Sequence, residues 1–325
     1  MGSKYSVMAS LVDVLASLYF DTVLDAFSGS GVVAYALKAM GKAVTANDFL
    51  TFSATIARAT IENSSEQLDS ADVARIMGPN ADGRDFISRT FRRLYFDAED
   101  LAFLDSAWSH IAHMTGSRRD LALASLCLAA AWKQPRGVFT VTSLRYDDGR
   151  RQLRTPLRTL FVEAVKDYNS TVFDSGRDHH ALCQDIADIP RAAFDAVYLD
   201  PPYAPPRDDC DYIKRYHFLE GLSVYWQDRP IRYDTMTRKL EKRFTPFAYP
   251  RTIREALRST FDQFRDSTII FSYSSNAVPD ATELMALLKS AKKHVQMIAV
   301  PHRYSFGTHS AAQRRQVREY IFVGE

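Results

Sequence analysis

The residues Asp200-Pro201-Pro202-Tyr203 place a carboxylate, two rigid turn residues and an aromatic ring in four consecutive positions. They follow residues 194–199, a short apolar run between turn formers that predicts a buried parallel strand. Two prolines directly after a strand fix the backbone and end the sheet. We therefore expect the carboxylate, the outward carbonyls and the ring at the C-terminal edge of this strand, where open α/β sheets bind ligands.

A second candidate site is the glycine-rich segment Asp25-Ala26-Phe27-Ser28-Gly29-Ser30-Gly31. It joins a predicted strand, residues 22–27, to a predicted helix, residues 32–40. Small residues let a backbone approach a ligand closely, and the N–H groups at a helix N-terminus suit a carboxylate. Asp48 ends the next predicted strand, residues 42–48, and is placed to accept two ribose hydroxyls. Dehydrogenases and kinases use similar turns, so this Rossmann-like βαβ unit alone leaves the ligand open.

The two segments together resemble the paired signature of the S-adenosylmethionine-dependent DNA adenine-N6 methyltransferases of the Dam-like and FokI-type groups. The resemblance rests on Phe27-x-Gly29-x-Gly31 followed by Asp200-Pro201-Pro202-Tyr203, in the α-group order of motifs. It implies that the four residues 200–203 are the catalytic motif and that S-adenosylmethionine is the cofactor.

The chemistry of such a reaction explains the residue types at 200–203. An exocyclic amine conjugated with its ring is a poor nucleophile, because its lone pair is delocalised. The Asp200 carboxylate and the Pro201 carbonyl can both accept its N–H bonds, which favours a more tetrahedral nitrogen whose lone pair points at the sulfonium methyl. Tyr203 offers a ring face on which an adenine that has left the duplex can stack. In-line attack then draws much of its rate from positioning.

The resemblance also implies which residues bind the cofactor. Lys4, within Gly2-Ser3-Lys4-Tyr5, matches a lysine that meets the carboxylate side of the cofactor, and Asp185 matches an acid that accepts its adenine amine. The alternative interpretations are a flexible N-terminal tail for Lys4 and a strand-end turn for Asp185. The implied cofactor-binding residues are Lys4, Asp25, Phe27, Gly29, Gly31, Asp48, Asp185 and Ile186. The histidines show no ligand spacing, so we expect no metal.

The periodicity of the chain predicts an α/β fold, with a Rossmann-like seven-stranded methyltransferase sheet and an inserted, mostly helical target-recognition subdomain. Further strands are predicted at 180–183, 194–199, 268–273, 295–300 and 317–323. The last two lack a long intervening helix, so they predict an antiparallel hairpin at the sheet edge. We expect residues 1–51 and 171–325 to form the methyltransferase domain, interrupted by residues 52–170.

The insertion, residues 52–170, occupies the slot in which the Dam-like group carries its target-recognition domain. Its first part is helical, and residues 137–153 change to a β-rich pattern with Asp148-Gly149 as a hairpin turn. Arginines of this basic hairpin are candidates for contacts to phosphates or guanine edges. They are Arg145, Arg150 and Arg151, for which a merely solvated surface is the alternative.

Two features after the catalytic motif also suggest substrate contacts. Tyr212, Tyr216 and Glu220 lie at i, i+4 and i+8 in a run that resembles FokI-type enzymes, so they should share one helix face. Tyr212 and Tyr216 either line the base pocket or pack on the sheet. The stretch 229–265 carries ten Lys/Arg against four acids, interleaved with aromatic residues, as a nucleic-acid surface often is. We expect this stretch in the second part of the methyltransferase domain.

The composition sets the broad class of the protein. The apolar content of 46% and charged content of 25% are ordinary for a globular protein, and no apolar run approaches a membrane span. Three scattered cysteines form neither a disulfide framework nor a metal signature, which fits a reducing cytosol. We therefore expect no membrane partner and a cytoplasmic location in a bacterial or phage context. The net charge of +2 neither demands nor excludes nucleic acid.

Three functions remain open at this point. The first is a site-specific DNA adenine-N6 methyltransferase of the restriction–modification, phage or orphan kind, acting on double-stranded DNA. No nuclease motif is present, so any cognate restriction endonuclease would be a separate chain. The second is an RNA base amino-methyltransferase, which the large helical insertion disfavours. N4-cytosine methyltransferases rank lower, because they more often have Ser at position 200. The third is a non-catalytic DNA-binding protein on the same scaffold, against which Asp200, Tyr203 and Phe27 argue.

Overall fold

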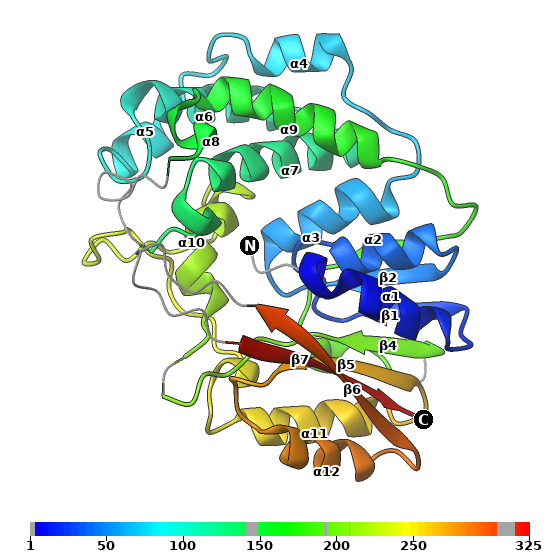
Figure 1. Cartoon of the computed structure of the whole chain (residues 1–325). Helices are drawn as coiled ribbons and strands as arrows, with labels where there is room; N and C mark the ends of the chain where they lie inside the picture. The colour runs from blue at the N-terminus through cyan, green and yellow to red at the C-terminus, as the bar shows by residue number, and fades with distance from the viewer. Residues whose placement is uncertain (1–3, 141–148, 192–193, 208, 304–315) are drawn as a thin grey trace. The chain divides into compact units, whose positions relative to one another are not determined.

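The computed structural model describes residues 4–140, 149–191, 194–207, 209–303 and 316–325. Backbone contacts divide the chain into two compact units (Figure 1). The sheet unit comprises Gly2–Phe49, Ser175–Asp211 and Phe244–Glu325, and the helical unit comprises Leu50–Asp174 and Tyr212–Arg243. In the described part of the chain, no helix is both long and apolar enough to span a bilayer.

The sheet unit is built on seven strands in the order β3-β2-β1-β4-β5-β7-β6. The first five run parallel, whereas β7 is antiparallel to both β5 and β6. This confirms the predicted seven-stranded α/β fold, with β6 and β7 as the terminal hairpin. The strands are β1 (Thr22–Asp25), β2 (Ala43–Asn47), β3 (His180–Leu182), β4 (Ala196–Leu199), β5 (Thr268–Ser274), β6 (Val295–Arg303) and β7 (Gln316–Gly324).

Helices cover both faces of this sheet (Figure 1). On one face, α1 (Met8–Ala16) and α2 (Val32–Ala39) pack against the strands, and on the other lie α11 (Ile253–Gln263) and α12 (Ala281–Lys289). Because successive side chains of a strand point to opposite faces, alternate strand residues form the core under α11 and α12. That core includes Leu24, Val197, Ile269, Phe271, Leu257, Phe261 and Leu284.

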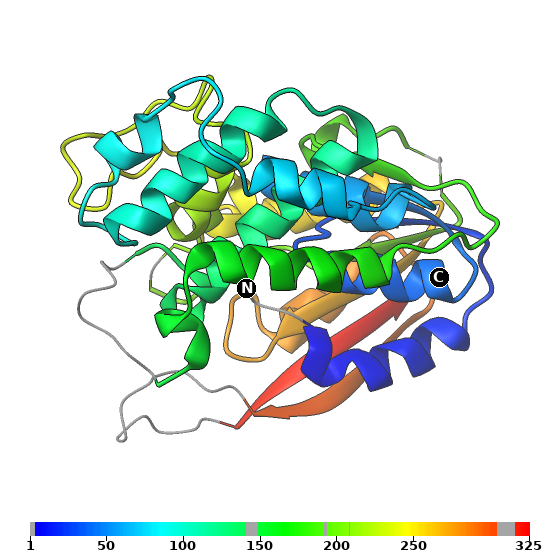
Figure 2. The same cartoon turned by 90° about the horizontal axis from the view of Figure 1, so that it is seen from above.

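Three short helical turns also belong to the sheet unit. They are η1 (Lys4–Val7), η5 (Ile186–Asp188) and η6 (Pro246–Ala248). The first of them, η1, lies beside β6, as the dark blue and orange segments of Figure 2 show. This contact brings the start of the chain to the side of the sheet that also holds β7.

The helical unit is organised around α7 (Gly116–Trp132), which is buried along most of its length. It packs against α3 (Thr51–Ala57), α6 (Ala98–Ile111), α9 (Leu157–Thr171) and α10 (Tyr212–Leu222). A π-helical segment, η2 (Arg58–Glu62), extends α3. The remaining elements are α4 (Ser70–Ile76), α5 (Phe86–Thr90), η3 (Pro135–Gly137) and α8 (Arg151–Arg154).

The β-rich hairpin predicted at 137–153 is wrong in its described part. Residues Pro135–Gly137 form a 3-10 turn and Arg151–Arg154 a single α-helical turn. The Phe139 N–H donates to the Arg215 carbonyl at 2.8 Å, and its ring stacks on Phe218 with centroids 4.8 Å apart. Packing onto α10 therefore overrides the β propensity of this segment. Residues 141–148, including Arg145, lie outside the described residues.

The segment Tyr212–Arg243 belongs to the helical unit, although the sequence pattern placed it in the second part of the methyltransferase domain. Trp226 packs against Phe91 and Phe218, with ring centroids 4.7 and 5.2 Å apart. Trp108 Nε1 donates to the Leu222 carbonyl at 2.7 Å. The basic stretch 229–265 is consequently shared between the two units, with its boundary after Arg243.

Candidate active site

The predicted catalytic motif, residues 200–203, begins where β4 leaves the sheet. All four residues of β4 are buried, and its neighbours β1 and β5 lie on either side of it. Pro201 and Pro202 are buried, whereas Asp200 and Tyr203 are partly exposed. The motif thus lies at the C-terminal edge of a central parallel strand, as expected from the sequence.

Asp200 and Tyr203 belong to a polar cluster that also contains Lys4 and Glu319; we name these four side chains the Asp200 cluster. Lys4 Nζ donates to Asp200 Oδ1 at 2.7 Å and lies 3.0 Å from Glu319 Oε1. The Tyr203 hydroxyl accepts from Lys4 Nζ and lies within hydrogen-bonding distance of Asp200 Oδ1, at 2.8 Å, and of Glu319 Oε1. The Asp200 side chain is 22% exposed and that of Glu319 4% exposed, so Asp200 is the carboxylate that a ligand can reach.

The electrostatics of the cluster keep its members in defined states. Burial alone would lower the pKa of the Lys4 ammonium, but Asp200 and Glu319 outweigh burial and raise that pKa. Burial, followed by the same two carboxylates, raises the pKa of Tyr203 well above its usual value. Lys4 is therefore a cation and Tyr203 a neutral phenol near pH 7. One ammonium facing two carboxylates leaves the cluster acidic, which suits a ligand that presents N–H groups or positive charge.

Glu319 is a site residue that the sequence analysis did not identify. It lies opposite Ser274 in the β5–β7 register, while Leu199, just before Asp200, lies opposite Phe271. Both acids therefore reach the same edge of the sheet. A signal was present in the sequence, because Glu319 shares its strand parity with Val317 and Ile321, which are buried. An acid between apolar residues on the buried face of a strand needs a partner.

The glycine-rich turn after β1 has the backbone conformation that glycine allows. Gly29 and Gly31 have φ of 52° and 76°, in the left-handed region that other residues rarely adopt. The Gly29 N–H donates to Asp48 Oδ2 at 2.9 Å, so Asp48 fixes this turn. Asn47 Nδ2 donates to the carbonyls of Ala26 and Gln184, both at 3.2 Å, which ties the ends of the neighbouring strands together.

Asp25 is buried beneath this turn. Its Oδ2 accepts the Ala34 N–H at 3.0 Å in the first turn of α2. Burial, with Asp200 as the next cause, raises the pKa of Asp25 to about 8. Asp25 Oδ1 and Ser28 Oγ are buried without a hydrogen-bond partner among the described residues. Buried polar atoms without a partner beside a glycine turn favour a polar ligand at this place.

Asp185 and Phe27 are two further residues of the predicted cofactor site. Asp185 Oδ1 accepts the Ala187 N–H at 3.1 Å and so caps η5, which is the turn role left open for it. Ile186 is buried in the core under α11, where Gln263 Nε2 donates to its carbonyl at 2.9 Å. Phe27 packs edge-to-face on Phe247, with centroids 5.1 Å apart. The sheet unit thus contains every residue proposed to bind the cofactor.

The two tyrosines of α10 lie against each other, as expected for one helix face, although the helix is irregular between them. The helix is kinked at Tyr216, which has φ of −115° and ψ of 15°. The Tyr216 ring lies 5.7 Å from that of Phe52 and 5.8 Å from that of Tyr212. Glu220 Oε2 accepts the Phe52 N–H at 3.3 Å. Tyr216 and Glu220 therefore pack on the start of α3, and Tyr212 is the partly exposed member of the pair.

Arg150 and Arg151 have partners within the helical unit. Arg150 donates to the Gln134 carbonyl at 2.9 Å. Arg151 forms a two-pronged pair with Glu163, at 3.0 and 2.6 Å, on the exposed surface. Exposed pairs of this kind contribute little to stability, because solvent screens their charges. Replacing Glu163 by a phosphate as the partner of Arg151 therefore changes the stability of the fold little.

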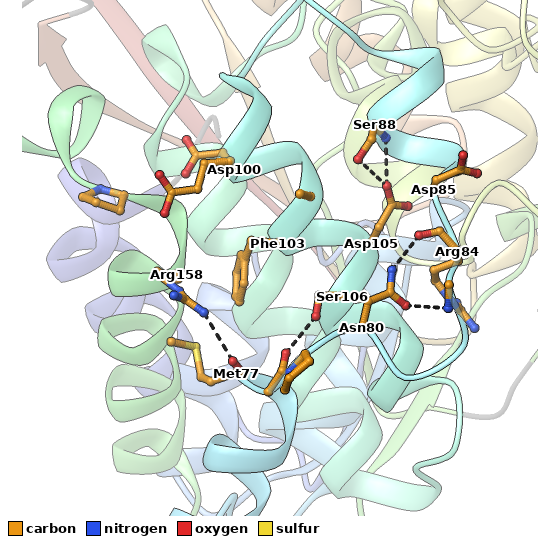
Figure 3. Close-up of a pocket in the computed structure, with 16 residues that line it drawn as sticks. Met77, Asn80, Arg84, Asp85, Ser88, Asp100, Phe103, Asp105, Ser106 and Arg158 are labelled. Carbon is orange, nitrogen blue, oxygen red and sulfur yellow. Dashed lines mark hydrogen bonds between the residues drawn. The ribbon is translucent and has the colours of Figure 1, made fainter.

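A cavity of about 650 Å³ in the helical unit lies apart from these residues (Figure 3). Arg158 donates to the Met77 carbonyl at 3.3 Å, and the Ser106 hydroxyl to the Gly78 carbonyl at 2.8 Å. The polar groups around the cavity thus hold the loop before α5 against its neighbours. None of the predicted site residues lines it. Within the described residues, no group of His, Cys, Asp and Glu side chains is arranged to hold a metal ion.

Comparison with known proteins supports the family resemblance. Residues 1–87 match the model of the D12 class N6 adenine-specific DNA methyltransferases. The chain is 26% identical over 307 residues to Type II methyltransferase M2.HphI of Haemophilus parahaemolyticus, covering 87% of this chain and 84% of the relative. It is 24% identical to Type II methyltransferase M.FokI of Planomicrobium okeanokoites, covering 99% and 52%, and 24% identical to Modification methylase StsI of Streptococcus sanguinis, covering 93% and 47%.

The chain spans most of the first relative and about half the length of the other two. The resemblance to FokI-type adenine methyltransferases, first recognised in the motifs, is confirmed by these matches. They support site-specific methylation of adenine in DNA as the activity of this chain, and a methyl donor as its cofactor.

Proposed function

We propose that this chain transfers a methyl group from S-adenosylmethionine to the exocyclic amine of an adenine flipped out of double-stranded DNA. The observation that carries the proposal is the Asp200 carboxylate, held at the end of β4 by Lys4 and by Tyr203. Base flipping is required because the amine is not accessible inside the duplex.

S-adenosylmethionine, when bound, supplies an electrophilic methyl on a sulfonium that leaves as a neutral thioether. Asp200 and the Pro201 carbonyl accept the two N–H bonds of the adenine amine and hold its lone pair towards that methyl. As the new C–N bond forms, the nitrogen becomes positive and loses one proton, for which Asp200 is the nearest exposed acceptor. Pro202 holds the turn rigid, and Tyr203 provides the stacking surface.

Lys4 helps to fix the geometry of this acceptor. Its ammonium lies 4.8 Å from the Tyr203 ring centroid, and Tyr273 packs edge-on against the same ring at 5.0 Å. Lys4 Nζ is hydrogen-bonded to the Tyr203 hydroxyl, and Glu319 is a second carboxylate partner for the same ammonium. We therefore assign Lys4 to the catalytic motif as well as to the cofactor's carboxylate side.

The residues of the sheet unit fit the proposed cofactor. The turn at Gly29 and Gly31 lets the backbone approach the amino-acid part, and Ser28 Oγ offers a buried polar atom without a partner among the described residues. In this proposal Asp48 accepts the ribose hydroxyls and Asp185 the adenine amine. Asp25 acts on the turn through α2, and Phe27 and Ile186 contribute the apolar wall.

We further propose that the helical unit reads the DNA sequence, with Arg150 and Arg151 contacting the backbone and Tyr212 bordering the base pocket. We also propose that the chain acts in the cytoplasm of a bacterium, encoded by the host or by a phage. Any cognate restriction endonuclease is a separate chain.

The function is tested by mapping methylated adenine in DNA from cells that express the chain. We expect N6-methyladenine at one short recognition sequence and unmodified adenine in cells that carry the empty vector. Methylated bases in RNA with none in DNA would instead establish an RNA base methyltransferase. If neither DNA nor RNA is methylated, the remaining alternative is a non-catalytic DNA-binding protein.

Replacing Arg150 and Arg151 together by alanine should weaken DNA binding. Log affinity falls linearly with log salt concentration, and each lost phosphate contact makes that line less steep by about 0.9. We expect a reduction of about one to two in that slope, measured by fluorescence anisotropy on duplex DNA. Glu163→Gln is the matched control, because it releases Arg151 and should strengthen binding at low salt. An unchanged slope in the double variant would assign phosphate contacts to other residues.

A further inference from the structure

A short hairpin, residues 230–241, forms the end of the helical unit's second segment. Ile231 and Leu240 pair in an antiparallel bridge. The Arg232 N–H donates to the Lys239 carbonyl at 2.7 Å, and the Glu241 N–H to the Pro230 carbonyl at 3.1 Å. These bonds define a two-stranded stem with residues 233–238 at its tip.

Hydrogen bonds within the tip, and one from a residue of the core, fix the conformation of the hairpin tip. The Thr235 hydroxyl donates to the Arg232 carbonyl at 2.7 Å and accepts the Lys239 N–H at 3.0 Å. Thr237 is buried, and its carbonyl accepts the hydroxyl proton of the core residue Tyr95 at 2.7 Å. The tip is therefore an ordered structure and its side chains have defined directions.

Two large apolar side chains of this ordered tip face solvent. Tyr233 is 58% exposed and Met236 75% exposed. Arg238 donates to the Tyr233 carbonyl, and its guanidinium lies 5.2 Å from the centroid of the Tyr233 ring. Exposed apolar groups on a fixed hairpin contribute nothing to the core of this chain, and such groups mark interaction sites.

The charge around the tip indicates the kind of partner. Residues 229–243 contain six basic residues and two acids: Arg229, Arg232, Arg238, Lys239, Lys242 and Arg243, against Asp234 and Glu241. Apolar side chains rimmed by arginines match a duplex, whose stacked bases lie between two rows of phosphates. A base-flipping enzyme also needs a group that weakens stacking, because taking a base out of the stack costs free energy.

We propose that the hairpin 230–241 is a wedge that inserts Tyr233 and Met236 into the base stack of duplex DNA. Arg232 and Arg238 contact the flanking phosphates, and the insertion lowers the free energy needed to extrude the target adenine. This inference rests on the proposed function, because it assumes a base-flipping reaction. It adds the element that opens the duplex, which the catalytic motif does not supply.

The test compares two duplexes that carry the mapped recognition sequence. In one the target adenine is paired with thymine, and in the other it faces a mismatched base, which makes extrusion easier. We expect Tyr233→Ala/Met236→Ala to reduce single-turnover methyl transfer on the matched duplex by about 10- to 100-fold. On the mismatched duplex we expect a reduction of less than about threefold. Tyr19→Ala, which removes a fully exposed tyrosine of the sheet unit, should leave both rates unchanged.

Each outcome of this comparison either supports the wedge or overturns it. Equal losses on both duplexes would show a general DNA contact or a folding defect and would overturn the wedge. Unchanged rates, with a change only in self-association by sedimentation, would make the hairpin a contact between copies of this chain. A wild-type chain without activity on either duplex would refute the proposed function itself. An active wild type with an equally active double variant would refute the wedge alone.

Discussion

Asp200→Ala is expected to reduce methyl transfer to duplex DNA by about 10³-fold or more, while binding of S-adenosylmethionine stays within a few-fold of wild type. Asp200 is the exposed carboxylate of its cluster and the proposed acceptor of the adenine N–H. The proposed cofactor contacts are made by other residues, so they survive the change. Transfer of labelled methyl groups to DNA and calorimetric titration of the cofactor measure the two effects.

A second variant at the same position distinguishes a loss of chemistry from a folding defect. Asp200→Asn keeps the shape and one oxygen acceptor but removes the negative charge that pairs with Lys4 at 2.7 Å. We expect a loss intermediate between wild type and Asp200→Ala. Activity near the wild-type level in both variants would exclude Asp200 from the chemistry.

Glu319→Gln should reduce the transfer rate constant by about 10- to 100-fold with a smaller change in the Michaelis constant for DNA. Glu319 is a positioning residue: it pairs with Lys4 and Tyr203, which in turn hold Asp200. Its carboxylate also helps to raise the pKa of Lys4. Neutralising it removes that support, so the pKa of Lys4 falls and the alkaline limb of kcat/KM moves to lower pH.

The shift in the pH profile distinguishes this role from general destabilisation. A loss of folded protein would lower the rate at every pH and leave the limb where it was. Glu255→Gln is the matched control, because it removes an exposed acid of the same unit whose ion pair with Arg258 lies on the surface of α11. A Glu319→Gln enzyme with an unchanged rate and pH profile would remove Glu319 from the site.

Local sequence patterns were enough to predict the sheet and its catalytic edge. An apolar run before Asp-Pro-Pro-Tyr predicted β4 and its end, and the glycine pair predicted a turn that the structure shows with positive φ at both positions. These features depend on neighbours within a few residues: side-chain alternation, the fixed φ of proline and the freedom of glycine. Rules of this kind are readable from a single sequence.

Features that depend on distant partners became evident only in the folded chain. Phe139 stacks on Phe218, a contact with a residue far along the chain that its own β-rich segment did not predict. Trp226 joins an aromatic core with Phe91, so Tyr212–Arg243 belongs to the helical unit. Such contacts depend on the volume and shape of the side chains. The periodic pattern of apolar residues does not record these properties, because an apolar residue of another size preserves the same pattern.

The Asp200 cluster contains residues that the sequence pattern identified and a residue that only the tertiary structure identified. Asp200 and Tyr203 were evident from four consecutive residues. Lys4 was recognised only by resemblance, and its pairing with Asp200 spans 196 positions of the chain. Glu319 was not recognised, because a single acid in a strand does not reveal which buried charge it faces. Electrostatic pairing acts through space, so only the folded sheet, with β7 beside β5, brings these charges together.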